Sequence, residues 1–170
     1  MTLYTRRISI GGENMRGELK IGRKAPDFEL QATTGHKIRL SDYEEKKNVI
    51  LLSFPLAFTP VWTGEISAFG ELISRFAELN AQVLGISVDS VYAQKAWIAT
   101  QGNPDYPLIS DFYPHGAIAR KYGLFLEDTG TWKRAILVID KNRIIRWSKI
   151  YESGENPNPM DALVALRNLP

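Results

Sequence analysis

The segment from Ser53 to Phe69, SFPLAFTPVWTGEISAF, has the residue order of a reactive site: an apolar strand, a turn bracketed by prolines and an amphipathic helix. Because Pro60 lies near the start of the helix, the backbone N–H groups that follow it have no partner within the helix. We expect the N–H groups of residues 61–63 to point toward position 62, with the positive end of the helix dipole behind them. Such a site favours an anion, whether bound or generated in place.

Three further residues could complete this site. Pro55 fixes the turn at the strand end, the hydroxyl of Thr59 can donate a hydrogen bond, and the carboxylate of Glu65 can accept one from an arginine or a backbone N–H. A strand–turn–helix junction with these residue types is also common for stability alone. The residues by themselves leave the functional and the structural interpretations open.

The residue at the centre of the site, Trp62, does not fit this chemistry, because an indole is a poor nucleophile and only donates a hydrogen bond. The chain contains no cysteine. This excludes disulfides, thiolate metal sites and cysteine-based redox chemistry from the chain as it stands. His36 and His115 are isolated from other ligand-type residues, so we expect neither a metal site nor a cofactor.

The composition bounds the class of protein. A chain of 170 residues with 44% hydrophobic residues predicts one domain over residues 1–170, with a glycine-rich N-terminal extension over residues 1–20. The 21 basic and 19 acidic side chains are interspersed, which argues against nucleic acid or an anionic membrane as a partner. No segment approaches the roughly 18 continuous apolar residues of a membrane span, and the N-terminus has no apolar core of signal-peptide length. We therefore expect a cytoplasmic protein.

The apolar pattern alternates between strands and helices along the chain. Two alternating runs around Thr34-Gly35 predict a hairpin within residues 27–43. Apolar residues at three- and four-residue spacing predict one long helix from Ile66 to about Asn80. Further strands are expected at 48–54, 81–88, 107–111, 135–140 and 143–150, and further helices from a cap at Asp89 or Ser90 to Gly102, at 116–123 and at 160–169. This order predicts an α/β fold with a mixed sheet and helices on its faces.

The stretch PLAFTPVWTGE resembles the peroxiredoxin signature PxxxTxxC, with Pro55 and Thr59 in place and Trp62 at the position of the peroxidatic cysteine. Residues 24–43 resemble the opening hairpin of that family, and residues 106–125 resemble a segment typical of the alkyl hydroperoxide reductase E type. Arg134 opens a strand where peroxiredoxins carry their active-site arginine. Without the resemblance, Arg134 would be an ordinary solvated arginine. The resemblance implies a thioredoxin-like fold, with a central mixed β-sheet flanked by helices and an N-terminal hairpin extension.

The resemblance also implies a chemistry for the site. In a peroxiredoxin a thiolate at position 62 attacks the O–O bond of hydrogen peroxide, an organic hydroperoxide or peroxynitrite, and a second thiol reduces the resulting sulfenic acid. Thr59 would then bond the peroxide and the thiolate, Pro55 would shield the pocket, and Arg134 would bind both sulfur and peroxide oxygen. Glu65 would orient Arg134 or a second arginine. Since no resolving cysteine is present, the parent enzyme would be of the one-cysteine type and need an external thiol reductant of the mycothiol, glutathione or thioredoxin class.

Trp62 cannot perform the nucleophilic step, so we expect this chain to lack peroxidase activity. Its indole is much larger than a thiol, and it either fills the peroxide pocket or opens the start of the helix. We favour an engineered variant of a working enzyme, because Pro55, Thr59, Glu65 and Arg134 still suit a thiolate. The alternative is a natural non-catalytic module that keeps the fold for binding or oligomerisation.

Several aromatic residues suggest packing surfaces. Trp97 and Trp147 fall on apolar faces and are expected in the core or at an interface. The resemblance implies a homodimer through the surface around the active-site turn, where Phe58, Phe112 and Tyr113 are available. Larger rings of dimers are also possible.

Overall fold

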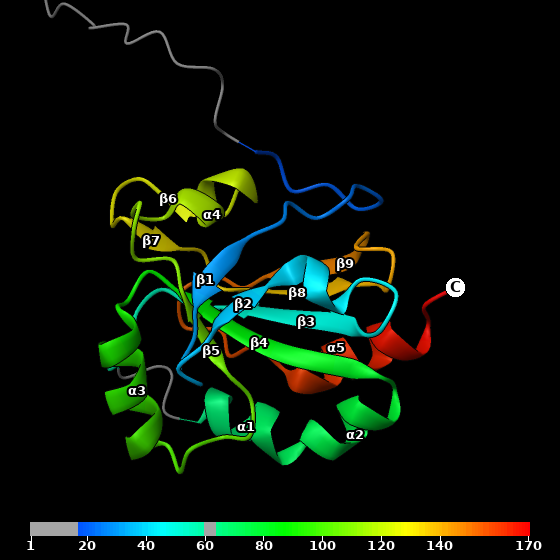
Figure 1. The fold of residues 1–170 in the computed structure, drawn as a ribbon, viewed down its shortest axis with the longest axis horizontal. Helices are drawn as coiled ribbons and strands as arrows, with labels where there is room; N and C mark the ends of the chain where they lie inside the picture. The colour runs from blue at the N-terminus through cyan, green and yellow to red at the C-terminus, as the bar shows by residue number, and fades with distance from the viewer. Residues whose placement is uncertain (1–16, 60–63) are drawn as a thin grey trace, which may run out of the picture.

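The computed structural model describes residues 17–59 and 64–170. Its centre is a five-stranded sheet in the order β5-β4-β3-β8-β9 (Figure 1). The two pairings among β3, β4 and β5 are parallel, whereas β8 runs antiparallel to β3, and β9 antiparallel to β8. The expected mixed sheet is therefore confirmed. The five strands are β3 (Asn48–Ser53), β4 (Ala81–Ser87), β5 (Leu108–Ser110), β8 (Ala135–Ile139) and β9 (Ile145–Ile150).

Two buried clusters cover the two faces of this sheet, because successive residues of a strand point to opposite sides. On β3, Val49 and Leu51 belong to one cluster, while Ile50 and Leu52 belong to the other. Figure 1 shows α1, α2 and α5 on one side of the sheet and α4 with the β6–β7 hairpin on the other. The helices are α1 (Glu65–Glu71), α2 (Ile73–Glu78), α3 (Val91–Thr100), α4 (Ala117–Lys121) and α5 (Pro159–Arg167), and the small hairpin pairs β6 (Phe125–Leu126) with β7 (Thr131–Trp132).

The N-terminal hairpin forms where the sequence predicts it. Strand β1 (Glu29–Gln31) pairs antiparallel with β2 (Lys37–Arg39), and the 3-10 turn η1 (Leu40–Tyr43) follows directly. Gly35 has a φ of 87°, a backbone conformation that residues other than glycine rarely adopt, so a glycine is needed at this turn. Of the expected N-terminal extension, residues 1–16 lie outside the described part of the chain.

The long helix predicted over residues 66–80 is wrong in one respect, because the structure divides it into α1 and α2. At Leu72 the backbone φ and ψ are −99° and 5°, and its N–H bonds to the carbonyl of Phe69 instead of continuing the helical ladder. Gly70 lies two residues earlier, and glycine is a poor helix former. The apolar spacing still identifies the buried face, since the rings of Phe69 and Phe76 stack with centroids 6.0 Å apart. Periodicity reports which side chains are buried and carries no information on a local break in the hydrogen bonds.

Helix caps and small strands account for the remaining differences. Ser90, and not Asp89, caps α3, because its hydroxyl accepts a hydrogen bond from the Ala93 N–H at 3.2 Å. The β6–β7 hairpin is not predicted from the sequence, since strands of two residues are too short to give an alternating pattern. Trp97 lies in the core, as expected, with its ring 5.0 Å from that of Phe54. Among the described helices, none is both long and apolar enough to cross a bilayer.

Candidate active site

The turn that follows β3 lies at the carboxyl edge of the parallel strands. Phe54 is fully buried and anchors the turn, while Pro55 and Thr59 are half-buried. The Thr59 hydroxyl donates a hydrogen bond to the Leu56 carbonyl at 3.0 Å, so in this structure it stabilises the turn itself. Trp62 and the N–H groups of residues 61–63 lie outside the described residues. The anion-receiving role of those groups, and the effect of the indole on the helix start, therefore stay predictions.

Asp89 holds this turn in place from the neighbouring strand. Its Oδ2 accepts hydrogen bonds from the Ala57 N–H at 2.8 Å and from the Ser87 hydroxyl at 2.7 Å. The Ser87 hydroxyl in turn accepts a bond from the buried amide of Gln94 at 3.0 Å. The Ser110 hydroxyl bonds to the Asp89 carbonyl at 2.6 Å. This network joins the turn to β4, β5 and α3, so Asp89 positions the turn and does not cap the helix.

Arg134 lies between β7 and β8, at the strand start where the sequence places it. The guanidinium donates from Nη1 to the Glu155 carbonyl at 3.2 Å, and the backbone carbonyl of Arg134 accepts from the Tyr151 N–H at 2.9 Å. Its side chain is half-buried. Arg134 is thus tied to the loop that follows β9 and is more constrained than an arginine in open solvent.

Glu65 is the first residue of α1 and is only 4% exposed. Neither carboxylate oxygen has a hydrogen-bond partner among the residues that the structure describes. Burial raises the pKa of Glu65 to about 7, and the charge of Arg134 opposes this shift. The buried Tyr106 also lies near, since the charge of Glu65 adds to the desolvation that raises the pKa of the Tyr106 phenol. At neutral pH the Glu65 carboxyl is therefore poised between its neutral and charged forms.

Two of the predicted site residues, Pro55 and Arg134, line one cavity of about 470 Å³. The cavity lies between the turn after β3, the β6–β7 hairpin and the end of β9; we name it the Arg134 cavity. Glu65 interacts electrostatically with Arg134 from α1, whereas Thr59 is absent from the cavity lining among the described residues. The structure thus brings Pro55, Glu65 and Arg134 to one end of the sheet. Leu56, Leu126, Lys133 and Ile150 also line the cavity.

Four exposed aromatic residues gather at the same edge of the sheet. Phe58 follows β3, Tyr92 follows β4, and Phe112 and Tyr113 follow β5; we name these four residues the aromatic edge. Their exposed fractions run from 54% for Phe112 to 86% for Tyr113. Three of them line a cavity of about 560 Å³ beside the N-terminal hairpin. Exposed aromatic side chains at this density are typical of an interaction surface.

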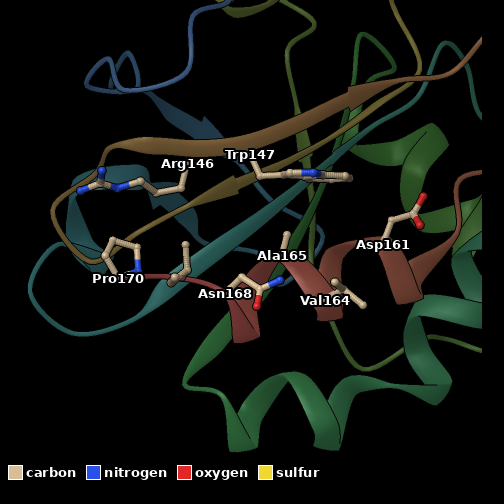
Figure 2. A pocket seen from close by; sticks show the side chains of 8 residues that line it. Arg146, Trp147, Asp161, Val164, Ala165, Asn168 and Pro170 are labelled. Carbon is tan, nitrogen blue, oxygen red and sulfur yellow. The ribbon is translucent and has the colours of Figure 1, made fainter.

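A further cavity, of about 360 Å³, lies between β9 and α5 (Figure 2). Trp147 is half-buried here and packs against the core beside α5, in agreement with the expected core or interface packing. Figure 2 shows the indole above Ala165 and Val164 of that helix. The acid in this cavity, Asp161, is already engaged by the Lys149 ammonium and the Tyr151 hydroxyl, each at 3.0 Å. The cavity holds none of the predicted site residues.

Sequence reasoning missed two residues near the site. The sequence suggests Asp89 only as a helix cap, although an acid two residues after a buried parallel strand lies at the edge where the turn also lies. Lys133 precedes Arg134 and lines the same cavity. Two adjacent basic residues at the start of a strand are the sequence feature from which this second cation could have been predicted. Within residues 17–59 and 64–170, no three side chains of the metal-ligating types gather in one place.

Comparisons with known proteins identify the family of the chain. The model of the AhpC/TSA family matches residues 21–148. A chloroplastic 2-Cys peroxiredoxin BAS1 of Spinacia oleracea is 43% identical over 143 residues. The aligned residues are 79% of this chain, and the chain spans only 53%, about half, of the length of that relative. Alkyl hydroperoxide reductase E of Mycobacterium tuberculosis is 38% identical over 151 residues, which cover 87% of this chain and 98% of that protein.

Solved structures give the same result. The reduced 2-Cys peroxiredoxin of Plasmodium vivax superposes with a TM-score of 0.80 at 29% identity, covering 86% of this chain and 80% of that chain. AhpC of Enterococcus faecalis superposes with a TM-score of 0.80 at 29% identity, covering 86% of this chain and 90% of that chain. The predicted thioredoxin-like α/β fold is confirmed by these neighbours. The family model matches well over half of the chain, and the chain therefore belongs to the AhpC/TSA family of peroxiredoxins.

Proposed function

We propose that this chain is a peroxiredoxin scaffold, built for thiol-dependent reduction of hydrogen peroxide, organic hydroperoxides or peroxynitrite, that lacks peroxidase activity. One observation carries the proposal: Trp62 occupies the signature position of the peroxidatic cysteine in a chain that has no cysteine. An indole offers no thiolate to attack the O–O bond, and no other sulfur nucleophile is available. The reaction cannot begin.

The remaining site residues support this assignment for a parent enzyme with cysteine at position 62. Arg134 would stabilise the thiolate and the charge that develops on the peroxide oxygen, and Pro55 would shield the pocket that both residues line. Thr59 would bond the peroxide once its hydroxyl leaves the Leu56 carbonyl. Glu65 would act by orienting Arg134, with which it interacts electrostatically. The thiol that returns the enzyme to its reduced state would come from an external reductant.

Restoring the thiol tests the proposal. Trp62→Cys is expected to give fast, peroxide-dependent oxidation in stopped-flow mixing, with sulfenic acid detected by mass spectrometry, while the unaltered chain with Trp62 shows neither. Trp62→Ser is the matched control, since it removes the indole and supplies no thiol. If Trp62→Cys shows no oxidation above the Trp62→Ser control, the peroxidase assignment of the scaffold fails.

A second function, a non-catalytic binding or oligomerisation module, is favoured by the aromatic edge. We propose a homodimer through this edge, because two copies related by a two-fold axis would cover Phe58, Phe112 and Tyr113 on both. Sedimentation velocity is expected to show a dimer that Tyr113→Ser weakens. Ile21→Ser, at an exposed apolar residue on the N-terminal segment, is the control and is expected to leave the dimer intact. A monomer at all concentrations contradicts the dimer and leaves the peroxidase proposal unaffected.

The origin of Trp62 is a separate proposal. We favour an engineered variant, because Pro55 and Arg134 line one cavity and Glu65 interacts with Arg134, an arrangement that would suit a thiolate at position 62. The codon for residue 62 in the source genome tests this directly. A tryptophan codon there favours the natural module, and a cysteine codon favours the engineered variant. The cytoplasmic location stays a prediction.

A further inference from the structure

Two neighbouring cavities lie between the N-terminal hairpin and α3. The first, of about 560 Å³, is the cavity that three residues of the aromatic edge line, and the second has a volume of about 350 Å³. The two cavities share lining residues from the hairpin and from the start of α3: Gln31, Lys37, Val91 and Tyr92. They are therefore two parts of one trough, which we name the hairpin trough. Each part is within the usual size of a small-molecule site, roughly 300–1,000 Å³.

The first part of the trough is aromatic. The rings of Tyr92, Phe112 and Tyr113 line it, and these side chains are 78%, 54% and 86% exposed. Rings that the fold leaves uncovered can stack on a flat aromatic ligand. The carboxamide of Gln31 lines the same part and offers both hydrogen-bond donors and an acceptor. This part of the trough therefore suits a heteroaromatic ring with polar groups at its edge.

The second part of the trough is basic. His36, Lys37 and Lys95 line it, and its lining includes no acid among the residues that the structure describes. The Lys37 ammonium is already paired, because it lies 3.5 Å from the Glu29 carboxylate. Lys95 is exposed, and within residues 17–59 and 64–170 no carboxylate lies within ion-pair distance of its ammonium. The Lys95 charge is thus available to an anion.

We propose that the hairpin trough binds a nucleotide. The base stacks on the ring of Tyr92 in the aromatic part, and the phosphates lie in the basic part, where the Lys95 ammonium binds them and His36 adds a hydrogen bond. Tyr92 lines both parts and lies three residues before Lys95 on α3, a spacing that places the two side chains on one side of the helix. The trough shares no lining residue with the Arg134 cavity, so the proposal is independent of residue 62 and of peroxide reduction.

Isothermal titration of the full chain with ADP tests the proposal. Saturable binding at one site is expected, with amide shifts in the ¹H–¹⁵N spectrum confined to residues 29–37, 90–95 and 110–113. Adenosine, which lacks the phosphates, and pyrophosphate, which lacks the base, are each expected to bind at least about tenfold more weakly than ADP. Tighter binding of a single-stranded RNA than of ADP would assign the trough to nucleic acid and overturn the proposal.

Variants separate the two parts of the trough. Lys95→Met is expected to raise the Kd for ADP about tenfold and to leave the Kd for adenosine unchanged, whereas Tyr92→Leu raises both. Lys95→Arg keeps the charge and should stay close to the unaltered chain. Lys47→Met, at an exposed lysine outside the trough, is the matched control and should leave the Kd for ADP unchanged. Absence of ADP binding, or equal effects of Lys95→Met and Lys47→Met, overturns the proposal whatever the outcome of the peroxidase assay.

The nucleotide and the proposed homodimer use some of the same side chains. The dimer would cover Phe112 and Tyr113, which also line the trough. ADP is therefore expected to weaken the dimer in sedimentation velocity. If a dimer forms and ADP binds without weakening it, the dimer uses another surface and the nucleotide site stands. The outcomes for the dimer and for the trough are thus distinguishable.

Discussion

The carboxyl group of Glu65 lies close enough to the guanidinium of Arg134 for the two to interact electrostatically, yet its oxygens accept no hydrogen bond from the described residues. Burial therefore outweighs the attraction, and the pKa of Glu65 rises to about 7 from its ordinary value of 4.5. The interaction joins the start of α1 to the start of β8. It makes the site sensitive to pH near neutrality.

Glu65→Gln is expected to remove a pH dependence of stability. The folded protein holds the Glu65 proton more tightly than the unfolded chain does. The unaltered protein therefore loses stability as the pH rises from the pKa of Glu65 in the unfolded chain to about 7, and it loses no further stability above that pH. The loss is of the order of 2–3 kcal/mol. Urea unfolding between about pH 5 and pH 8 measures the difference in slope between the two proteins. Equal slopes in parent and variant would show that Glu65 does not titrate as described.

Arg134→Met is expected to move this pH dependence upward. Arg134 lowers the pKa of Glu65, so removing its charge lets burial raise that pKa further. The fall in stability with rising pH should then extend to a higher pH than in the parent. Arg134→Lys, which keeps a positive charge, is the matched control and is expected to stay closer to the parent curve. A shift in the opposite direction contradicts the electrostatic interaction.

Asp89→Ala is expected to destabilise the fold by about 1–3 kcal/mol, because it leaves the Ala57 N–H without its acceptor and disrupts the buried bonds of Ser87. Urea unfolding at neutral pH measures the loss. Asp105→Ala, at an exposed acid before β5, is the control and should change stability by less than about 0.5 kcal/mol. If the two variants lose the same stability, Asp89 does not hold the turn.

Ser90→Ala and Asn158→Ala are each expected to cost about 1 kcal/mol of stability. Their side chains accept hydrogen bonds from the N–H groups of Ala93 and Met160, at the starts of α3 and α5. Thermal unfolding measures both losses. Ser74→Ala, at an exposed serine within α2, is the comparison, and there alanine is expected to be neutral or slightly stabilising. A neutral result at Ser90 would show that the cap does not contribute.

Much of the fold could be predicted because it depends on local pattern. The alternating hairpin around Gly35 and the buried runs of β3 and β4 follow directly from the order of apolar and polar residues. The break at Leu72 and the β6–β7 hairpin could not be predicted. The break does not change which residues are apolar, and the hairpin is too short to show a period.

The candidate site divides in the same way. The signature around Pro55 and Thr59, the missing cysteine and the position of Arg134 can all be read from residue types and spacing. The hydrogen bond from the Ala57 N–H to Asp89, the burial of Glu65 near Arg134, and the cavity that Pro55 and Arg134 line together depend on how separate elements pack. Spacing along a chain specifies which side of an element is apolar. Which side chains meet across the end of a sheet depends on packing between residues that lie tens of positions apart, and this packing also sets the burial on which a pKa depends.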